Sequence, residues 1–150
     1  MHELRHNEPC PHCGRFDNRG VSIDAVIIRD GKVLLIKRGL EPNKGFWATP
    51  GGYVEWDESA EQTVQREVKE ETGLTTRSVR LVGVYSAPGR HPKQVINLLY
   101  VVDVEEGEPL AGDDAEGIRW FALDNLPEQL ALDHKQNIAD AQKALAADRL

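Results

Sequence analysis

The pattern of apolar and polar positions predicts strands over much of the chain. Two β-branched, aliphatic runs, Val21–Arg29 and 32–37, are joined by Asp30-Gly31, a dipeptide that favours a tight two-residue turn. This pattern predicts a β-hairpin. Further apolar runs predict three more strands, at 79–85, 95–104 and 117–123.

Two segments have helical character. The first, 58–71, can be capped at its start by Ser59 or Asp57 and at its end by Gly73. From about residue 128, apolar positions recur every three or four residues, which predicts an amphipathic terminal helix. The stretch 39–52 is rich in Gly and Pro and is expected to be a long loop. Strands mixed with two separated helices predict one α+β or layered α/β domain.

The first helix places acidic side chains where a protein normally buries apolar ones. At 100° per residue, Val64 and Val68 form an apolar stripe; Glu67 and Glu71 lie on the same side, with Glu70 at its margin. Partial burial of carboxylates costs several kcal/mol per ion unless a countercharge is present. The pattern therefore predicts either raised pKa values or a bound hard divalent cation such as Mg²⁺ or Mn²⁺. An exposed acidic helix is the alternative.

The opposite face of that helix is expected to be polar and solvated. Glu58 is assigned to this polar face, together with Glu61 and Lys69. Before the helix, Pro50 precedes Gly51 and Gly52, which lack a Cβ and allow the backbone to approach a ligand or ion closely.

Charge is distributed unevenly over the 150 residues. The net charge of −7 disfavours partners such as nucleic acid and acidic membranes. Residues 55–71 carry −5 and residues 103–116 carry −7, so the rest of the chain carries +5. This separation predicts a cation site beside an anion site. The start of the chain lacks the apolar stretch of a signal peptide, and no run is long enough to span a membrane, so a cytoplasmic protein is expected.

The two cysteines lie close together near the start. Cys10 and Cys13 belong to a Cys-Pro-His-Cys-Gly stretch that is similar to half of a zinc ribbon, within an expected N-terminal leader of residues 1–20. His2 and His6 lie upstream, but the chain has no second cysteine pair. Two interpretations stay open: a Zn²⁺ site, or a metal-free flexible leader.

The spacing of a set of glycine and charged residues between positions 52 and 74 is too specific to be a chance pattern. Gly52 is followed after five residues by Glu58, after seven more by Arg66-Glu67-Val68, then by Glu70-Glu71 and Gly73-Leu74. This series resembles the box of the Nudix hydrolase family at every fixed position. The resemblance extends over residues 21–150 and implies an α/β/α layered sandwich, with a mixed β-sheet between helices.

The resemblance also implies roles for residues of the box. Glu67, Glu70 and Glu71 would be metal ligands, joined by the carbonyl oxygen of Gly51. Arg66 and Glu58 would orient these carboxylates rather than bind metal, although a purely structural ion pair is an equal alternative. The general base would be Glu70 or a residue of the acidic segment 112–116, with Glu116 as the named candidate.

The substrate is suggested by less specific segments. Residues 82–90, 111–121 and 130–134 resemble small ADP-ribose pyrophosphatases of this family, which implies the products AMP and ribose 5-phosphate. The alternatives are another nucleotide (NADH, a nucleotide sugar or an oxidised nucleoside triphosphate) and a non-catalytic ADP-ribose sensor. Family resemblance also implies a homodimer.

Candidate substrate contacts come from basic and aromatic residues. The basic candidates for phosphate contacts are Arg38, Lys44, Arg90 and Lys93. The aromatic candidates for stacking on adenine are Phe46, Trp47 and Tyr85, for which core packing is the commoner role. His91 and His134 are expected in a loop and on a helix surface rather than as ligands.

Overall fold

The computed structural model describes residues 6–148. Residues 1–5 of the predicted leader, His2 included, and residues 149–150 of the predicted domain lie outside the described part. The strands are β1 (Val21–Arg29), β2 (Lys32–Arg38), β3 (Trp47–Ala48), β4 (Gly51–Tyr53), β5 (Thr76–Tyr85), β6 (Ile96–Val104) and β7 (Ala115–Ala122). The helices are α1 (Ala60–Thr72) and α2 (His134–Ala147), with a short 3₁₀ turn at Pro88–Arg90.

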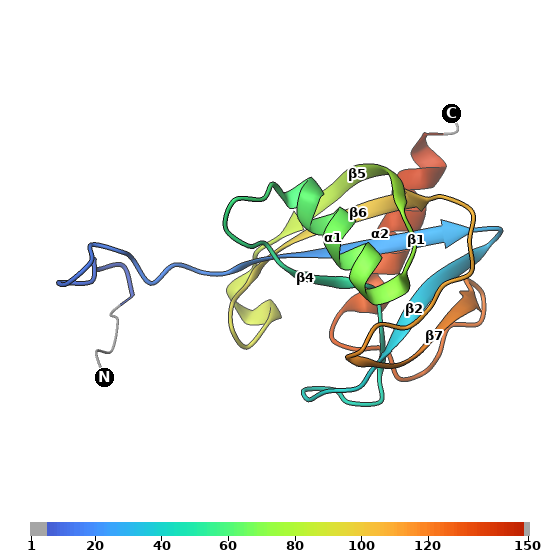
Figure 1. Ribbon diagram of the computed structural model, residues 1–150, viewed down its shortest axis with the longest axis horizontal. Helices are drawn as coiled ribbons and strands as arrows, with labels where there is room; N and C mark the ends of the chain where they lie inside the picture. Colours follow the sequence, from blue (N-terminus) through green and yellow to red (C-terminus); the bar gives the residue numbers. More distant parts are fainter. Residues whose placement is uncertain (1–5, 149–150) are drawn as a thin grey trace.

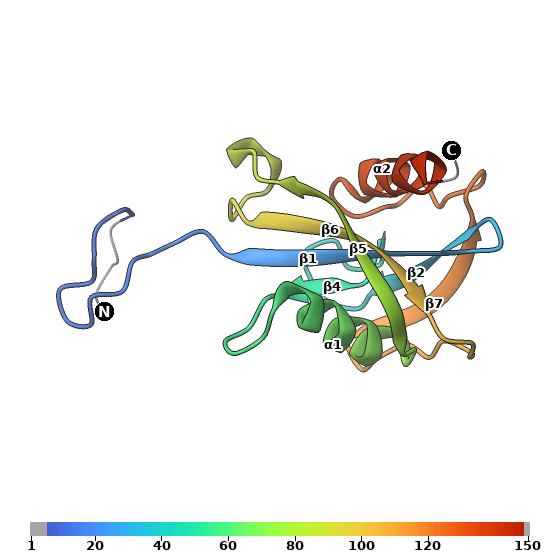
Figure 2. The same ribbon diagram turned by 90° about the horizontal axis from the view of Figure 1, so that it is seen from above.

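The strands form one mixed sheet between two helices. Its main path runs β3-β2-β1-β6-β5, with β4 paired to β1 and β7 paired to β2 (Figure 1). The pair β1 and β6 is parallel, whereas β1 is antiparallel to β2 and β4. Helix α1 lies on one side of the sheet and α2 on the other (Figure 2). The α/β/α sandwich implied by the family resemblance is therefore confirmed.

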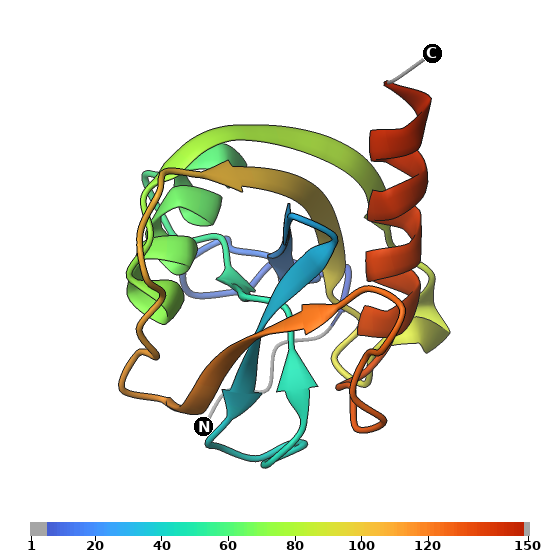
Figure 3. The ribbon, with the colours of Figure 1, turned by 90° about the vertical axis from the view of Figure 1, so that its right-hand side faces the viewer.

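Strand β1 is covered on both faces, which explains its nearly continuous apolar sequence. Ile23, Ala25 and Ile27 pack toward Val64 and Val68 of α1. Val26 packs on the other side, with Ile138 and Ala141 of α2. Figure 3 shows the strongly twisted sheet between the two helices. The sheet therefore has one core on each face.

The turn and cap residues act as their chemistry predicts. Asp30 and Gly31 both have positive φ, at 52° and 72°, as a tight hairpin turn requires. Ser59 is the N-cap of α1, and its hydroxyl accepts a hydrogen bond from the Gln62 backbone N–H, so this N-cap candidate is confirmed over Asp57. Gly73 ends the helix in the left-handed conformation, with φ 74°.

Several predicted boundaries are wrong. Helix α1 begins at Ala60, so Glu58 precedes it, and the expected loop at 39–52 contains the short strands β3 and β4. Helix α2 begins at His134 rather than near residue 128 because the chain before it is held extended. There Trp47 N–H donates to Gln129 O at 2.8 Å, and Ala131 N–H donates to Trp47 O at 2.8 Å. Strand β5 starts at Thr76, three residues earlier than expected.

The start of the described chain stands apart from the sandwich. Residues 6–17 form a small hairpin, with isolated bridges between His6 and Asp17 and between Pro9 and Phe16. This hairpin projects from the end of the sheet at which β1 begins (Figure 1). None of the helices within residues 6–148 is long and apolar enough to cross a membrane.

Candidate active site

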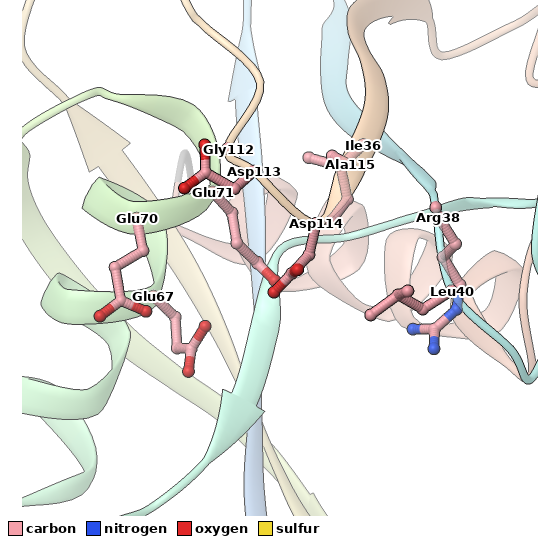
Figure 4. Close-up of a pocket in the computed structure, with 11 residues that line it drawn as sticks. Ile36, Arg38, Leu40, Glu67, Glu70, Glu71, Gly112, Asp113, Asp114 and Ala115 are labelled. Carbon is pink, nitrogen blue, oxygen red and sulfur yellow. The ribbon is translucent and has the colours of Figure 1, made fainter.

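Three glutamates of α1 border a cavity at the edge of the sheet. The cavity has a volume of 440 Å³ and lies between α1, the end of β2 with its following loop, and the loop before β7. We call it the carboxylate cavity, and Figure 4 shows its lining side chains. Its lining residues are Ile36, Arg38, Gly39, Leu40, Glu67, Glu70, Glu71, Gly112, Asp113, Asp114 and Ala115.

Glu71 is the most deeply placed of the three. Its Oε2 accepts a hydrogen bond from Gly51 N–H at 2.8 Å. Burial raises the pKa of the Glu71 carboxyl to about 8, against the effect of that hydrogen bond. The nearby negative charges of Glu67, Asp24 and Glu70 raise it further. Burial likewise raises the pKa of Glu67. The prediction of carboxylates on the buried side of this helix is thus confirmed.

The two glycines of β4 let the backbone approach these carboxylates. A Cβ on Gly52 would lie 2.2 Å from Glu67 Oε1, and a Cβ on Gly51 would lie 2.3 Å from the Ile23 carbonyl oxygen. Neither contact is sterically allowed, so any side chain here would displace the carboxylate or the strand. Glycine is therefore required at positions 51 and 52, because the backbone there lies so close to strand β1 and to the Glu67 carboxylate.

Arg66 links four groups around the site. Its Nε and Nη2 donate to the two Glu58 oxygens at 3.0 and 2.8 Å, and its Nη1 donates to Glu67 Oε1 at 2.7 Å and Glu70 Oε2 at 3.4 Å. Nη2 also donates to Tyr53 O at 3.1 Å. The Arg66 guanidinium holds the pKa of Glu58 at about 2. Arg66 thus fixes the Glu67 side chain by a direct ion pair.

The placement of Glu58 on the solvated face of the helix is wrong. Its side chain is only 14% exposed and folds back over the start of α1, where Oε1 also accepts hydrogen bonds from Thr63 Oγ1 and Glu55 N–H, both at 2.8 Å. Because Glu58 lies before the first helical residue, its direction does not follow the 100° rotation of the helix.

The acidic loop before β7 is attached to the end of α1. Gly112 N–H donates to the Glu71 carbonyl oxygen at 3.3 Å, and a Cβ on Gly112 would lie 2.4 Å from the Glu70 carbonyl oxygen. This contact brings Asp113 and Asp114 to the cavity wall. Glu116 is exposed and does not line the cavity.

A second cavity of 590 Å³ adjoins the first. It shares Ile36, Arg38 and Glu71 with the carboxylate cavity, and we call it the polar cavity. Basic side chains line one part of its wall: Arg38, Arg90, His91 and Lys93. Its floor carries buried or nearly buried polar groups: Asp24, Thr49, Asn97 and His134. A cavity lined by acidic residues thus adjoins one with basic residues on its wall, while the cation site beside an anion site stays a prediction.

Long-range hydrogen bonds hold the floor of the polar cavity. Asp24 Oδ2 accepts from Asn97 Nδ2 at 2.8 Å and from Asn137 Nδ2 at 3.2 Å. His134 Nδ1 accepts from Thr49 N–H at 2.9 Å, and His134 Nε2 lies 3.9 Å from Asp24 Oδ2. Sequence reasoning missed Asp24, although a carboxylate inside an apolar strand is a visible signal. It placed His134 on a helix surface, which is wrong because the residue is 6% exposed.

Arg90 is positioned by an acidic partner. Its Nε and Nη2 donate to the two Asp133 oxygens at 2.6 and 3.1 Å. Its Nη1 is buried and has no hydrogen-bond partner among the described residues. A guanidinium that is held on one side and unsatisfied on the other can bind an anion from the cavity.

Several predicted contact residues are engaged elsewhere. Trp47 packs edge-on against Phe121 with ring centroids 4.7 Å apart, and Phe46 packs against the cluster around Ala48. Tyr85 donates its hydroxyl to Asp140 Oδ2 at 2.5 Å. Lys44 is exposed. None of these four residues lines either cavity, so the core-packing alternative describes the three aromatic residues better.

The candidate donors for a cation are the carboxylate oxygens of Glu67, Glu70 and Glu71, which do not surround a common point in this structure. Within residues 6–148, no three His, Cys, Asp or Glu side chains form a ready-made metal site. Instead, Arg66 holds Glu67 and Glu70 by its positive charge. The all-oxygen donor set and the glycine backbone beside it fit a hard divalent ion.

Comparisons with known proteins agree with this geometry. The model of the NUDIX domain matches residues 18–141. The chain is 50% identical over 121 residues to an ADP-ribose pyrophosphatase of Methanocaldococcus jannaschii, covering 80% of this chain and 71% of that protein. It is 38% identical over 127 residues to the NAD-capped RNA hydrolase NudC of Haemophilus influenzae, covering 79% of this chain. The match spans only 46% of that longer relative.

The fold also matches solved structures. The NUDIX domain of Shewanella oneidensis NrtR, complexed with ADP ribose, aligns with a TM-score of 0.77 at 28% identity, covering 87% of this chain and 90% of that one. The family model covers most of the chain and includes the carboxylates of α1. This chain belongs to the Nudix family.

Proposed function

We propose that this protein hydrolyses the pyrophosphate bond of ADP-ribose to give AMP and ribose 5-phosphate. The observation that carries the proposal is the position of Glu71, whose carboxylate borders both the carboxylate cavity and the basic, polar cavity next to it. The identity with a relative named as an ADP-ribose pyrophosphatase and the fold shared with a domain complexed with ADP ribose support this substrate.

The residues present fit a divalent cation, Mg²⁺ or Mn²⁺. Glu67, Glu70 and Glu71 would hold it with the Gly51 carbonyl oxygen, all hard oxygen donors. The observation that supports the fit is the cradle at Gly52, which a Cβ would fill by approaching Glu67 Oε1 to 2.2 Å. When bound, such an ion neutralises phosphate oxygens and lowers the pKa of an attacking water.

The protein's own residues hold the reacting groups in place. Arg66, itself held by Glu58, fixes the Glu67 carboxylate and contacts Glu70. Glu70 has a 59% exposed side chain at the cavity, which makes it our candidate for accepting the proton of the attacking water. Within the acidic loop, Asp113 and Asp114 line the cavity, so they are better placed than Glu116 for a second acid or base role.

The polar cavity is our candidate site for the rest of the substrate. Arg90, through its unsatisfied Nη1, and Arg38 and Lys93 would contact phosphate groups. His134 and Asp24 on the floor would hydrogen-bond a sugar hydroxyl. Lys44, Trp47 and Tyr85 would need another conformation or another chain to reach the substrate. A homodimer and a cytoplasmic location stay predictions.

A substrate panel tests the proposal. The purified protein is incubated with Mg²⁺ and ADP-ribose, NADH, a nucleotide sugar, an oxidised nucleoside triphosphate or an NAD-capped RNA, and the products are separated by chromatography. We expect the highest kcat/KM for ADP-ribose, with AMP and ribose 5-phosphate as products. Faster turnover of another substrate would overturn the assignment. Binding of ADP-ribose without turnover of any nucleotide would support the sensor alternative.

A further inference from the structure

The loop between β5 and β6 forms much of the wall of the polar cavity. We call residues 86–95 the cavity loop. Three of the four basic side chains on the cavity wall belong to it: Arg90, His91 and Lys93. The loop lies at the end of the sheet at which β1 begins, beside the point where the N-terminal segment joins that strand (Figures 1 and 2). The position of these basic groups therefore depends on how one loop is held.

Apolar packing holds little of the cavity loop. Within it only Val95, the last residue, is buried, whereas residues 86–89 and 92–94 are exposed. A segment with few buried apolar contacts opens locally at little cost, so hydrogen bonds decide its conformation. The bonds that hold the loop thus decide where its basic side chains lie.

Arg19 joins the two ends of the cavity loop. Its Nη2 donates to the Ser86 carbonyl oxygen at 2.7 Å, and its Nε donates to the Gln94 carbonyl oxygen at 2.6 Å. Both donors belong to one planar guanidinium, so a single rigid group holds both carbonyls. Hydrogen bonds from a charged donor are also stronger than neutral ones. The first residue of the loop is therefore linked to its next-to-last residue by a side chain from outside the loop.

The backbone beside Arg19 is itself fixed to the sheet. Ile96 N–H, directly after the loop, donates to the Gly20 carbonyl oxygen at 2.8 Å, and Val21 pairs with Ile96 in the parallel register. A Cβ on Gly20 would lie 3.2 Å from Tyr53 Cε1, so the chain here packs closely against β4. Arg19 therefore reaches the loop from an anchored position.

A second attachment holds the middle of the loop. Asp133, the residue before α2, accepts two hydrogen bonds from Arg90. His91 and Lys93 lie between that attachment and the Arg19 bond at Gln94, and Lys93 N–H donates to His91 Nδ1 at 3.0 Å. Asp133 thus fixes Arg90, whereas Arg19 fixes the end of the segment that follows it.

We propose that Arg19 is a positioning residue for substrate binding, which keeps the cavity loop closed so that its basic side chains face an anionic part of the substrate. The inference rests on the proposed role of the polar cavity in binding the nucleotide. Arg19 lines neither cavity, so it acts through the loop and not by touching the substrate. A loop that is ordered before binding loses less conformational entropy when the substrate arrives, which raises affinity.

The expected kinetic signature is a higher KM at constant kcat. The candidate catalytic carboxylates belong to α1, whereas the two hydrogen bonds of Arg19 go to the cavity loop. Loss of Arg19 should therefore remove binding that the ground state and the transition state share. General damage to the fold would instead lower the melting temperature.

Two measurements on the full chain test the proposal. Hydrogen–deuterium exchange without nucleotide follows the loop amides, among them the bonded N–H groups of Arg90, Lys93 and Gln94. Steady-state hydrolysis with Mg²⁺ of the nucleotide that is cleaved fastest in the substrate panel gives kcat and KM. For Arg19→Ala we expect faster exchange confined to the loop, an unchanged melting temperature, an unchanged kcat and a KM raised about tenfold, the loss of roughly one hydrogen bond.

The two proposals fail in different ways. If no nucleotide is hydrolysed, the proposed function is wrong, and the Kd of ADP-ribose measured by calorimetry with Mg²⁺ takes the place of KM. The loop exchange of Arg19→Ala is measured without substrate, so it tests the link between Arg19 and the loop in either case.

Two further variants separate the contact with the loop from charge alone. Arg15→Ala removes the same charge from the small hairpin, where its guanidinium lies 5.4 Å from the centre of the Trp56 ring, and should leave loop exchange and KM unchanged. Arg19→Lys keeps the charge but lacks the planar fork, so its KM should rise only as far as its loop exchange does. An equal rise in KM for Arg15→Ala, unchanged loop exchange in Arg19→Ala, fast loop exchange with an unchanged KM in either Arg19 variant, or a fall in kcat at constant KM would overturn the proposal.

Discussion

The backbone N–H of Thr49 donates a hydrogen bond to Nδ1 of His134 at 2.9 Å, joining the segment before β4 to the first residue of α2. A ring nitrogen that accepts a backbone N–H carries no proton, so the proton of the neutral imidazole is on Nε2. That Nε2 lies 3.9 Å from Asp24 Oδ2, too far for a direct hydrogen bond. A donor and an acceptor therefore face each other across a gap that a substrate hydroxyl or a water can bridge.

Two substitutions of His134 distinguish its two nitrogen atoms. Asn can accept from Thr49 N–H as Nδ1 does but removes the Nε2 donor, whereas Gln can replace the Nε2 donor but leaves Thr49 N–H unsatisfied. We expect His134→Asn to keep the melting temperature and raise KM for ADP-ribose about tenfold, the loss of roughly one hydrogen bond. His134→Gln should lower stability by about 1–3 kcal/mol with a smaller effect on KM. Equal KM values for His134→Asn and the unmodified protein would exclude a substrate contact.

Loss of one carboxylate charge should abolish most of the activity without unfolding the protein. Glu70→Gln keeps the shape of an exposed side chain, so we expect an unchanged melting temperature and a fall in kcat of about 10²- to 10⁴-fold. Glu61→Gln, on the same helix but outside both cavities, is the matched control and should retain activity. Steady-state product formation from ADP-ribose is the measurement; a rate for Glu70→Gln near that of the control would refute the role of Glu70.

The contact between Arg66 and Glu58 should affect the rate of hydrolysis, because it holds the guanidinium that positions Glu67. Lys in place of Arg66 cannot form the two parallel bonds to Glu58 while also reaching Glu67. We expect Arg66→Lys and Glu58→Gln each to reduce kcat about 10- to 100-fold, as is usual for groups that orient ligands. The double variant should lose little more than either single one. Strictly additive losses would contradict a shared function of the pair.

Gly52 can be tested with a single added carbon. Gly52→Ala would place its Cβ 2.2 Å from Glu67 Oε1, so the carboxylate must move. We expect a fall in kcat of at least about 100-fold. Gly107→Ala is the control, because its Cβ would lie 3.4 Å from the nearest atom, Leu74 Cδ2. If Gly52→Ala and Gly107→Ala had the same kcat in the hydrolysis assay, the close approach of Gly52 to Glu67 would not be needed for catalysis.

The buried Glu71 should make stability depend on pH and on metal. Its pKa of about 8 lies above the ordinary value of 4.5, so between these values the folded state binds more protons than the unfolded state. Without metal, the free energy of unfolding should therefore fall by a few kcal/mol as pH rises from about 4.5 to about 8. Denaturation in chelator at pH 5, 6, 7 and 8 measures this slope. Glu71→Gln should flatten it, and Mg²⁺ should oppose it most at the higher pH.

The carboxylate side of the site could be predicted from sequence because it is local. Helical rotation alone places Glu67 and Glu71 on the side of Val64 and Val68, and the structure buries both valines completely. The same rotation fails for Glu58, which precedes the helix by two residues. Short-range geometry is thus informative only within the element that produces it.

The polar side could not be predicted because its contacts are distant in sequence. Asp24 is separated by 73 residues from Asn97 and by 113 from Asn137, and only the parallel pairing of β1 with β6 and the packing of α2 bring them together. The burial of His134, which the sequence places on a helix surface, depends in the same way on a distant contact, its hydrogen bond from Thr49 N–H, 85 residues earlier in the chain. The sequence offers Trp47 as a candidate for stacking on adenine, whereas its edge-on contact with Phe121 shows a packing role.

Because Glu71 forms part of the wall of both cavities, the two cavities lie at a fixed distance from each other, and the site would select substrates by their length. If Arg90 holds an anionic group as we propose, this contact would fix one end of the substrate, and the carboxylates of α1 would define a second point at a constant separation from it. Only a molecule whose phosphate linkage falls at that separation would then present the correct phosphorus atom for attack. The length between the two anionic parts of a nucleotide, as much as the identity of its base, would then decide which bond is cut.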